Sequence, residues 1–185
     1  MPRFSTTTAL AGAAAAFLLA AGAPVAGAVS GEAAEPHVVT YDASQAEEFQ
    51  GAVDEAAQVW NGQLSNVKLQ KATDGQADLT VLADDNWPRA QTDSLGVGTV
   101  WIGRAAVEEG HHIPRITTHE IGHILGLPDD RTGVCADLMS GASAGTDCKN
   151  NLPNPDEKAE VDENFAQGAV IQPRLFTEEP VLAAG

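Results

Sequence analysis

Residues 119–129 combine the side chains best suited to chemistry, in the order His-Glu-Ile-Gly-His-Ile-Leu-Gly-Leu-Pro-Asp. Two imidazoles, those of His119 and His123, lie four positions apart, and the carboxyl group of Glu120 follows the first. A catalytic zinc ion takes such nitrogen and oxygen ligands and keeps one position for water. A carboxylate beside that water can accept its proton. The segment therefore predicts a hydrolytic zinc site.

A helix over residues 113–125 would position these groups. Its apolar residues recur every three or four positions: Ile113, Ile116, Ile121, Ile124 and Leu125. Residues four apart share a helical face, so both imidazoles can reach one metal ion at roughly 2.0–2.1 Å. Glu120 is rotated by about 100° from His119. This direction suits a base acting on the water better than a ligand.

The end of this helix predicts the third ligand. Gly126 can adopt the left-handed conformation that terminates a helix, and Pro128 prevents the helix from resuming. The chain then turns back, so Asp129 can approach the metal from another direction. No histidine follows the motif, and the next glutamate is Glu157. Asp129 has the fitting spacing, with Asp130 as the alternative.

The N-terminus predicts export. Arg3 precedes an apolar run over residues 9–23, and Ala26-Gly27-Ala28 forms a small-residue cleavage pattern. We expect residues 1–28 to be a signal peptide and residues 29–36 a short prosegment or connector. The mature protein is then secreted to the extracellular medium.

The cysteines agree with an oxidising compartment. The sequence contains two, Cys135 and Cys148. In an exported protein we expect them to form a disulfide, which contributes about 3 kcal/mol for a loop of this length. Zinc ligation is the alternative use, but two histidines and an aspartate suffice. No cysteine precedes the domain, so we expect no cysteine-switch propeptide.

The charge balance limits the partners. The 185 residues include 26 acidic and 10 basic side chains, a formal net charge of −16. Such a surface opposes binding to nucleic acid and to anionic membranes. We expect protein or peptide substrates as the partners, and a monomer.

The remaining pattern predicts a small α+β domain. Strands are expected over residues 37–42, 67–70, 79–82 and 97–102. The buried face of a helix between the first two strands is marked by Phe49, Ala52, Val53, Ala56 and Trp60. Asn154 is expected to cap the last helix. Residues 167–185 lack periodicity, and we expect a flexible or removable extension.

The zinc motif resembles the aspartate variant of the metzincin signature, as found in the snapalysin family of small secreted neutral proteases from actinobacteria. The segment Cys135-Ala136-Asp137-Leu138-Met139-Ser140-Gly141 is similar to that family's Met-turn, which implies that Met139 packs beneath the zinc. Other similar segments are residues 38–42, 58–61, 90–93 and 154–156. The resemblance covers residues 37–166. It implies a metzincin-like zinc metalloprotease domain, with helices packed on a twisted mixed sheet.

Two departures from the family concern the site. Many metzincins place a tyrosine near the zinc, but the position after the motif is Arg131 here and the sole tyrosine, Tyr41, is far upstream. A guanidinium can stabilise an oxyanion, so Arg131 is a candidate; the alternative is a solvated loop arginine. Relatives can bind calcium before the zinc helix. The corresponding residues 111–114, His-His-Ile-Pro, lack hard oxygen ligands, which disfavours calcium, and loop histidines are most often surface residues.

The resemblance also implies how substrate binds. In metzincins an extended peptide adds to the open edge of a strand that precedes the zinc helix. Thr99–Ile102 is the candidate for this edge, and an internal strand is the alternative. Snapalysin-like enzymes favour an aromatic residue after the scissile bond.

These observations predict a secreted zinc endopeptidase. His119, His123 and Asp129 hold zinc, and Glu120 takes a proton from water and delivers it to the leaving nitrogen. Three other classes are alternatives: a zinc amidase, a non-enzymatic zinc-binding protein and a protein with structural zinc. The Met-turn argues against the first, and Glu120 against the second. A closed site with four ligands would mark the third, whereas the sequence offers three.

Overall fold

A six-stranded mixed sheet forms the centre of the computed structural model, which describes Met1 and residues 35–73 and 75–180. The strand order is β2-β1-β3-β5-β4-β6. The strands are β1 His37–Gln45, β2 Val67–Lys71, β3 Leu79–Asp84, β4 Arg89–Ser94, β5 Val97–Gly103 and β6 Arg174–Thr177. The signal peptide expected over residues 1–28 lies outside the described residues, as does most of the connector.

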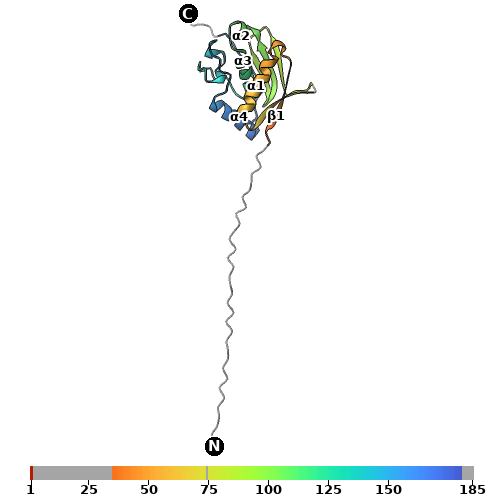
Figure 1. Ribbon diagram of the computed structural model, residues 1–185, viewed down its shortest axis with the longest axis vertical. Coiled ribbons are helices and arrows are strands. Elements are labelled where there is room, and N and C mark those ends of the chain that lie inside the picture. Colours follow the sequence, from red (N-terminus) through yellow and green to blue (C-terminus); the bar gives the residue numbers. More distant parts are fainter. Residues whose placement is uncertain (2–34, 74, 181–185) are drawn as a thin grey trace. The chain divides into compact units, whose positions relative to one another are not determined.

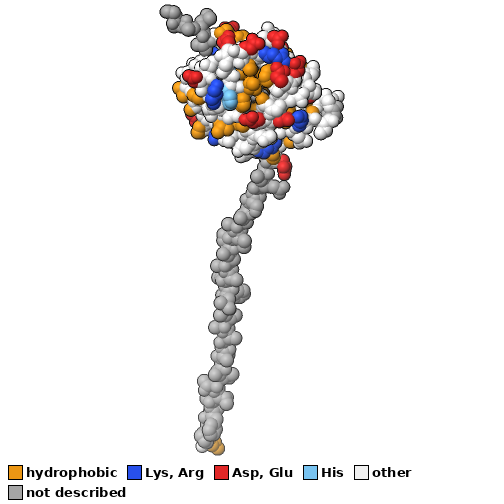
Figure 2. All heavy atoms as spheres, turned by 45° about the horizontal axis from the view of Figure 1, so that its top comes forward, with side chains coloured by type: hydrophobic (Ala, Val, Ile, Leu, Met, Phe, Trp, Pro, Cys, Tyr) orange, Lys and Arg blue, Asp and Glu red, His pale blue; other side chains and the backbone are white. Residues whose placement is uncertain are grey.

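Helices pack against this sheet, as Figure 1 shows. They are α1 Gln50–Gln63, α2 Arg104–Glu108, α3 Ile113–Ile124 and α4 Pro155–Gln167, with 3-10 helices η1 Glu47–Phe49 and η2 Leu138–Ala144. The α+β class is therefore as predicted. Within the described part of the chain, no helix is both long and apolar enough to cross a membrane. On the face seen in Figure 2, acidic side chains are scattered among basic, hydrophobic and uncharged ones.

Alternating burial along β1 shows which face of the sheet is covered. Val39, Tyr41 and Ala43 are buried, whereas the residues between them are half-buried. Successive side chains of a strand point to opposite faces, so one face meets the helices. Helix α1 buries Val53, Ala56, Ala57 and Trp60, close to the predicted set. The Trp60 indole donates a 3.1 Å hydrogen bond to the Thr118 carbonyl, which joins α1 to α3.

The predicted substrate edge was wrong. Strand β5, which includes Thr99–Ile102, pairs with β3 in parallel and with β4 antiparallel, so both of its edges are occupied. Strand β4 lies outside it and was not predicted. Its sequence, Arg-Ala-Gln-Thr-Asp-Ser, is too polar to read as a strand, although Ala90 and Thr92 are buried.

Part of the C-terminal extension forms a strand. Residues 174–177 form β6, which pairs antiparallel with β4. This short strand has one buried side chain, Phe176, so it carries too little periodicity for a prediction. Its partner lies more than eighty positions away in the sequence, and only the assembled sheet brings the two together.

Helix α4 begins as predicted. The Asn154 side chain accepts hydrogen bonds from the backbone N–H groups of Asp156 and Glu157, and Glu157 completes a capping box. Gly168 ends the helix in the left-handed conformation, at φ 61°. The second Glu157 oxygen accepts a 2.7 Å hydrogen bond from the Met139 backbone N–H. The cap of α4 therefore also fixes the segment beneath α3.

Candidate active site

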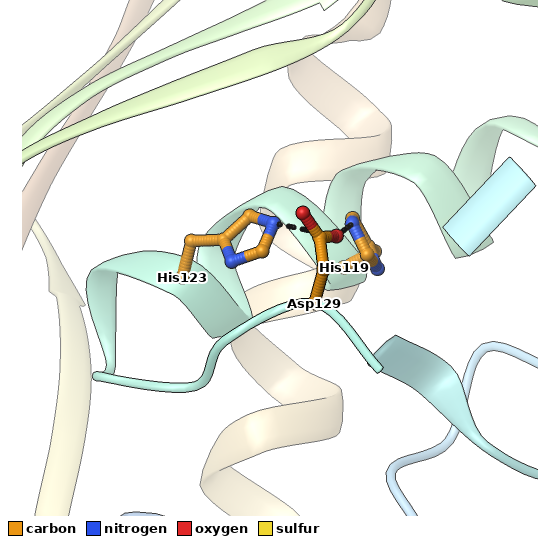
Figure 3. A group of neighbouring side chains, drawn as sticks. All are labelled: His119, His123 and Asp129. Atoms are coloured by element: carbon orange, nitrogen blue, oxygen red, sulfur yellow. Dashed lines mark ion pairs between the residues drawn. The ribbon is translucent and has the colours of Figure 1, made fainter. Parts of the chain in front are cut away.

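Helix α3 and the turn after it bring three predicted ligands together. His119 and His123 are 2% and 1% exposed, and both lie on the same face of α3. Figure 3 shows the Asp129 carboxylate between the two imidazoles. Its Oδ1 atom lies 3.4 Å from His119 Nε2 and 3.5 Å from His123 Nε2. Asp130, the alternative ligand, is exposed.

Backbone carbonyls orient both imidazoles. His119 Nδ1 donates to the Leu138 carbonyl at 3.0 Å, and His123 Nδ1 donates to the Leu127 carbonyl at 2.8 Å. A carbonyl can only accept, so the proton of each neutral ring is held on Nδ1. The lone pair on each Nε2 then faces Asp129. Such carbonyl partners are typical of histidines that bind metals.

The turn that delivers Asp129 depends on Gly126. Its φ of +100° lies in the left-handed region, and a Cβ atom there would come within 2.7 Å of the Asn164 side chain. The Leu127 N–H bonds to the Gly122 carbonyl at 3.0 Å as α3 ends. The chain reverses here, as the glycine and the proline after it predicted.

The donor set fits a metal ion. Within residues 35–73 and 75–180, the only group of this kind is His119, His123 and Asp129, whose ligand atoms lie within 4.8 Å of one another. Tetrahedral zinc with ligands at roughly 2.0–2.2 Å separates them by about 3.3 Å. His119 Nε2 and Asp129 Oδ1 are buried without a hydrogen-bond partner. A cation between them would satisfy both.

Electrostatics distinguishes the two imidazoles. Burial opposes protonation of His119, but the carboxylates of Asp129 and Glu178 outweigh it and raise the pKa to about 10. Burial lowers the pKa of His123. Burial also disfavours the Asp129 carboxylate, yet both imidazoles hold the pKa of this group below its usual range. Without metal, His119 is therefore the imidazole that carries a proton at neutral pH.

Glu120 is buried beside this group. It is 1% exposed, and neither carboxyl oxygen has a hydrogen-bond partner. Burial raises its pKa to about 8, against the attraction of His119 and with added repulsion from Glu178 and Asp129. A carboxyl group with a pKa close to neutrality can both accept and donate a proton.

A pocket opens beside Glu120. Its wall includes the two loop histidines before α3 and an unpredicted tryptophan: Trp87, Pro88, Ala106, His111, His112 and Ala142. The edge of the His111 ring contacts the Trp87 ring, with the two centroids 5.8 Å apart. His111 and His112 are therefore half-buried and line the pocket. Loop histidines are more often exposed on the surface, which was the alternative for these two. Nothing in the local sequence marks Trp87, because it precedes a strand that was not predicted.

Met139 packs under α3. Its side chain is 2% exposed, and a Cβ atom on Gly122 would come within 2.8 Å of its sulfur. The Asp130 N–H donates to the Met139 carbonyl at 2.9 Å. The methionine is thus tied to the residue next to Asp129.

The disulfide segment is held by a buried arginine that was not predicted. Cys135 and Cys148 form the expected disulfide. The Arg115 guanidinium, on α3, donates to four carbonyls of the surrounding loops: those of Cys135, Asp137, Leu138 and Asn150. Arg115 is 5% exposed. A charged residue within the apolar helix is the signal that could have identified it.

Arg131 lies at the edge of the site. Its Nη2 atom is 3.4 Å from Asp129 Oδ2 and donates to the Thr177 carbonyl at 3.1 Å. It also lies 3.5 Å from Glu178 Oε1. Tyr41 is not at the site: its hydroxyl donates to Asp54 on α1 at 2.9 Å, and burial raises its pKa to about 12.

Two residues of the extension reach the site. The Phe176 ring stacks on the His123 ring, with centroids 4.0 Å apart and planes 9° from parallel. Glu178 is 5% exposed, and its Oε1 atom lies 3.1 Å from His119 Nε2. Sequence reasoning missed both, because neither belongs to a motif.

Comparison with known proteins relates this sequence to a family. The profile of the Streptomyces extracellular neutral proteinase (M7) family matches residues 37–168. An extracellular small neutral protease of Streptomyces coelicolor is 40% identical over 133 residues, which span 70% of this chain and 60% of that protein. The counterpart from Streptomyces caespitosus is 39% identical over 132 residues, which span 70% of this chain and 98% of that protein.

Among solved structures, archaemetzincin from Methanopyrus kandleri aligns with a TM-score of 0.47 and 13% identity, over 75% of this chain and 99% of that one. The match to the Streptomyces coelicolor protein leaves about 40% of that protein uncovered, since it spans 60% of its length. On its family profile and its Streptomyces relatives, this chain belongs to the Streptomyces extracellular neutral proteinase (M7) family.

Proposed function

We propose that this protein is a secreted, zinc-dependent endopeptidase. The observation that carries the proposal is the juxtaposition of the unpartnered His119 Nε2 and Asp129 Oδ1 atoms with the buried carboxyl group of Glu120. His119, His123 and Asp129 would hold the ion. Bound zinc lowers the pKa of a coordinated water and polarises a carbonyl group.

The chain's own residues then move the proton. Glu120 accepts a proton from the attacking water and donates it to the leaving nitrogen. Its pKa of about 8 without metal leaves both protonation states accessible near neutral pH. The carbonyls of Leu138 and Leu127 keep the imidazoles in the tautomer that offers Nε2. Met139 supports α3 from below.

Arg131 supplies positive charge at the rim of the cleft. Its Nη2 atom lies 3.4 Å from Asp129 Oδ2, so it can also reach an oxyanion formed next to the ligands. An Arg131→Met substitution should lower kcat more than it raises KM. Arg131→Lys should recover part of the loss, because a lysine keeps the charge but not the planar donor pair.

The substrate is an extended peptide, whose residue after the scissile bond enters the pocket next to Glu120. The pocket's aromatic and apolar wall, which includes Trp87, Ala106 and Ala142, supports a preference for an aromatic side chain there. Export is supported by the extracellular relatives and by the pattern expected of residues 1–28. The net charge of −16 opposes binding to nucleic acid and to anionic membranes.

Casein hydrolysis by the purified secreted protein tests the proposal. Glu120→Gln should abolish hydrolysis, whereas Glu108→Gln, which changes an exposed glutamate on α2, should leave it unchanged. A chelator should inactivate the parent protein, and zinc should restore it. Equal hydrolysis by the parent and the Glu120 variant would refute the proposed role of this residue. Retention of bound zinc by a variant without activity would separate metal binding from catalysis.

A further inference from the structure

The C-terminal segment Arg174–Glu178, here called the cleft segment, lies along β4 and against the candidate metal ligands. Its strand β6 pairs antiparallel with β4, and the partners run from Arg89 with Thr177 to Thr92 with Arg174. Strand β4 is the last strand on this side of the sheet apart from β6. The backbone groups along such an edge are what an extended peptide needs for recognition.

Side chains anchor the cleft segment to the site. Phe176 is 9% exposed and stacks on the ring of His123. The Cζ atom of the Arg174 guanidinium lies over the Phe176 ring, 4.5 Å from its centroid. The Arg131 guanidinium donates to the Thr177 carbonyl at 3.1 Å. A residue expected at the rim of the catalytic site is therefore engaged by the chain's own C-terminal part.

Glu178 brings a further carboxylate to the metal ligands. Its N–H donates to the Pro88 carbonyl at 3.0 Å, and its Oε2 accepts a 2.8 Å hydrogen bond from the Ala142 N–H. The other oxygen, Oε1, lies 3.1 Å from His119 Nε2 and 3.5 Å from Arg131 Nη2, and it has no hydrogen-bond partner. A buried carboxylate oxygen in this position requires a proton or a cation beside it.

The backbone near Glu178 makes room for it. Gly141 has a φ of +57°, and a Cβ atom at this position would come within 2.5 Å of Glu178 Oε1. The glycine belongs to η2, in the loop that also carries Met139. The carboxyl group thus fits a recess that any other residue at 141 would fill.

The cleft segment lies beyond the part of the chain that the family shares. The family match ends at residue 168, and the Streptomyces caespitosus relative is matched over 98% of its length by 132 residues. The family profile therefore does not include β6. In this chain an additional segment covers the edge strand and the metal ligands.

We propose that the cleft segment is an internal inhibitor that occupies the substrate edge of β4 and places Glu178 as an additional ligand to the metal. The part concerning inhibition rests on the proposed function. An added carboxylate ligand fills the position that a catalytic metal keeps open for water. Peptide substrates must displace β6 and Glu178 before they can bind, so the full chain is less active than one whose cleft segment is detached.

Full-length variants test this without removing any residue. Phe176→Ala and Glu178→Gln, alone and combined, weaken two of the anchoring contacts. Glu179→Gln is the matched control, because this neighbouring glutamate is exposed. Three readouts are independent of catalysis: hydrogen exchange of the β4 amides in metal-free protein, zinc affinity by competition with a chromophoric chelator, and binding of a labelled peptide with the sequence of residues 173–179.

We expect the β4 amides of the double variant to exchange hydrogen faster than those of the parent. We expect Glu178→Gln to lower zinc affinity by about tenfold. The labelled peptide should bind the double variant but not the parent, whose own segment occupies the edge. Hydrolysis of a short peptide should increase in the double variant. Exchange, zinc affinity and peptide binding that match the parent would overturn the proposal. Changes in these three readouts with no hydrolysis in any variant would uphold the occupied cleft and refute the endopeptidase.

Discussion

Gly122 lies directly against the sulfur of Met139, so that a Cβ atom on this glycine would come within 2.8 Å of Sδ. The same Cβ atom would lie 3.3 Å from the Trp60 ring. Gly122 is between the two histidines in the sequence of α3. The position of the two imidazoles above Met139 therefore depends on the absence of a side chain at residue 122.

A Gly122→Ala substitution should destabilise the fold, although alanine favours helix formation. The added methyl group must displace Met139 or shift α3, and overpacking of this kind costs about 1–3 kcal/mol. Thermal unfolding of the metal-free protein measures the effect. Gly51→Ala is the matched control, because nothing lies within 4 Å of a Cβ atom there. It should be neutral or stabilising by up to about 1 kcal/mol. Equal melting temperatures for the two variants would contradict the packing argument.

Replacement of the third ligand should weaken zinc binding. Asp129→Asn keeps the shape of the side chain but removes the charge that attracts a cation between the imidazoles. We expect zinc affinity to fall by more than about tenfold. Asp130→Asn alters the adjacent, exposed carboxyl group and should leave affinity unchanged. Chelator competition distinguishes the two, and a larger effect at Asp130 would reverse the assignment of the ligand.

Zinc binding should release protons. Without metal, His119 has a pKa raised to about 10, so its imidazole is protonated at neutral pH and must lose that proton to bind metal. A raised pKa means that protons compete with the metal below pH 10 and that this competition weakens as the pH rises. Zinc affinity should therefore increase by about tenfold for each pH unit between pH 6 and pH 8.

Calorimetry in two buffers of different ionisation enthalpy measures the release. We expect at least about one proton per zinc at pH 7, from His119, with an added fraction from Glu120. The pKa of this glutamate is raised to about 8, so most of the protein carries its proton at pH 7. Zinc binding without proton release would mean that the metal-free site is already deprotonated.

Local signals predicted the helix and the turn that carry the candidate site better than they predicted its surroundings. The apolar period of α3, the left-handed turn at Gly126 and the spacing of Asp129 all lie within a short stretch of sequence. Each depends on backbone preferences of nearby residues, so the structure has the helix and its reversal where they were expected. The cap at Asn154 was predictable for the same reason.

Features set by distant partners were not predictable. Thr99–Ile102 has the composition of either an edge or an internal strand, and its place inside the sheet follows from its two neighbours. Phe176 pairs with Ala90, and this contact exists only once β4 is in place. Arg115 was missed because its four carbonyl partners come from loops that assume their shape only in the folded protein.

Arg115 should therefore contribute more to stability than any local pattern indicates. Arg115→Met would fill similar space but leave the carbonyls of Asp137 and Asn150, among others, without their donor. We expect a loss of about 3 kcal/mol or more in the free energy of unfolding, measured with urea while the disulfide is intact. Arg115→Lys should recover only part, because one ammonium cannot reach all of these carbonyls. Lys149→Met, at an exposed position, is the control and should change stability by less than about 0.5 kcal/mol. If the Arg115 and Lys149 variants were equally stable, the disulfide alone would hold this loop against α3.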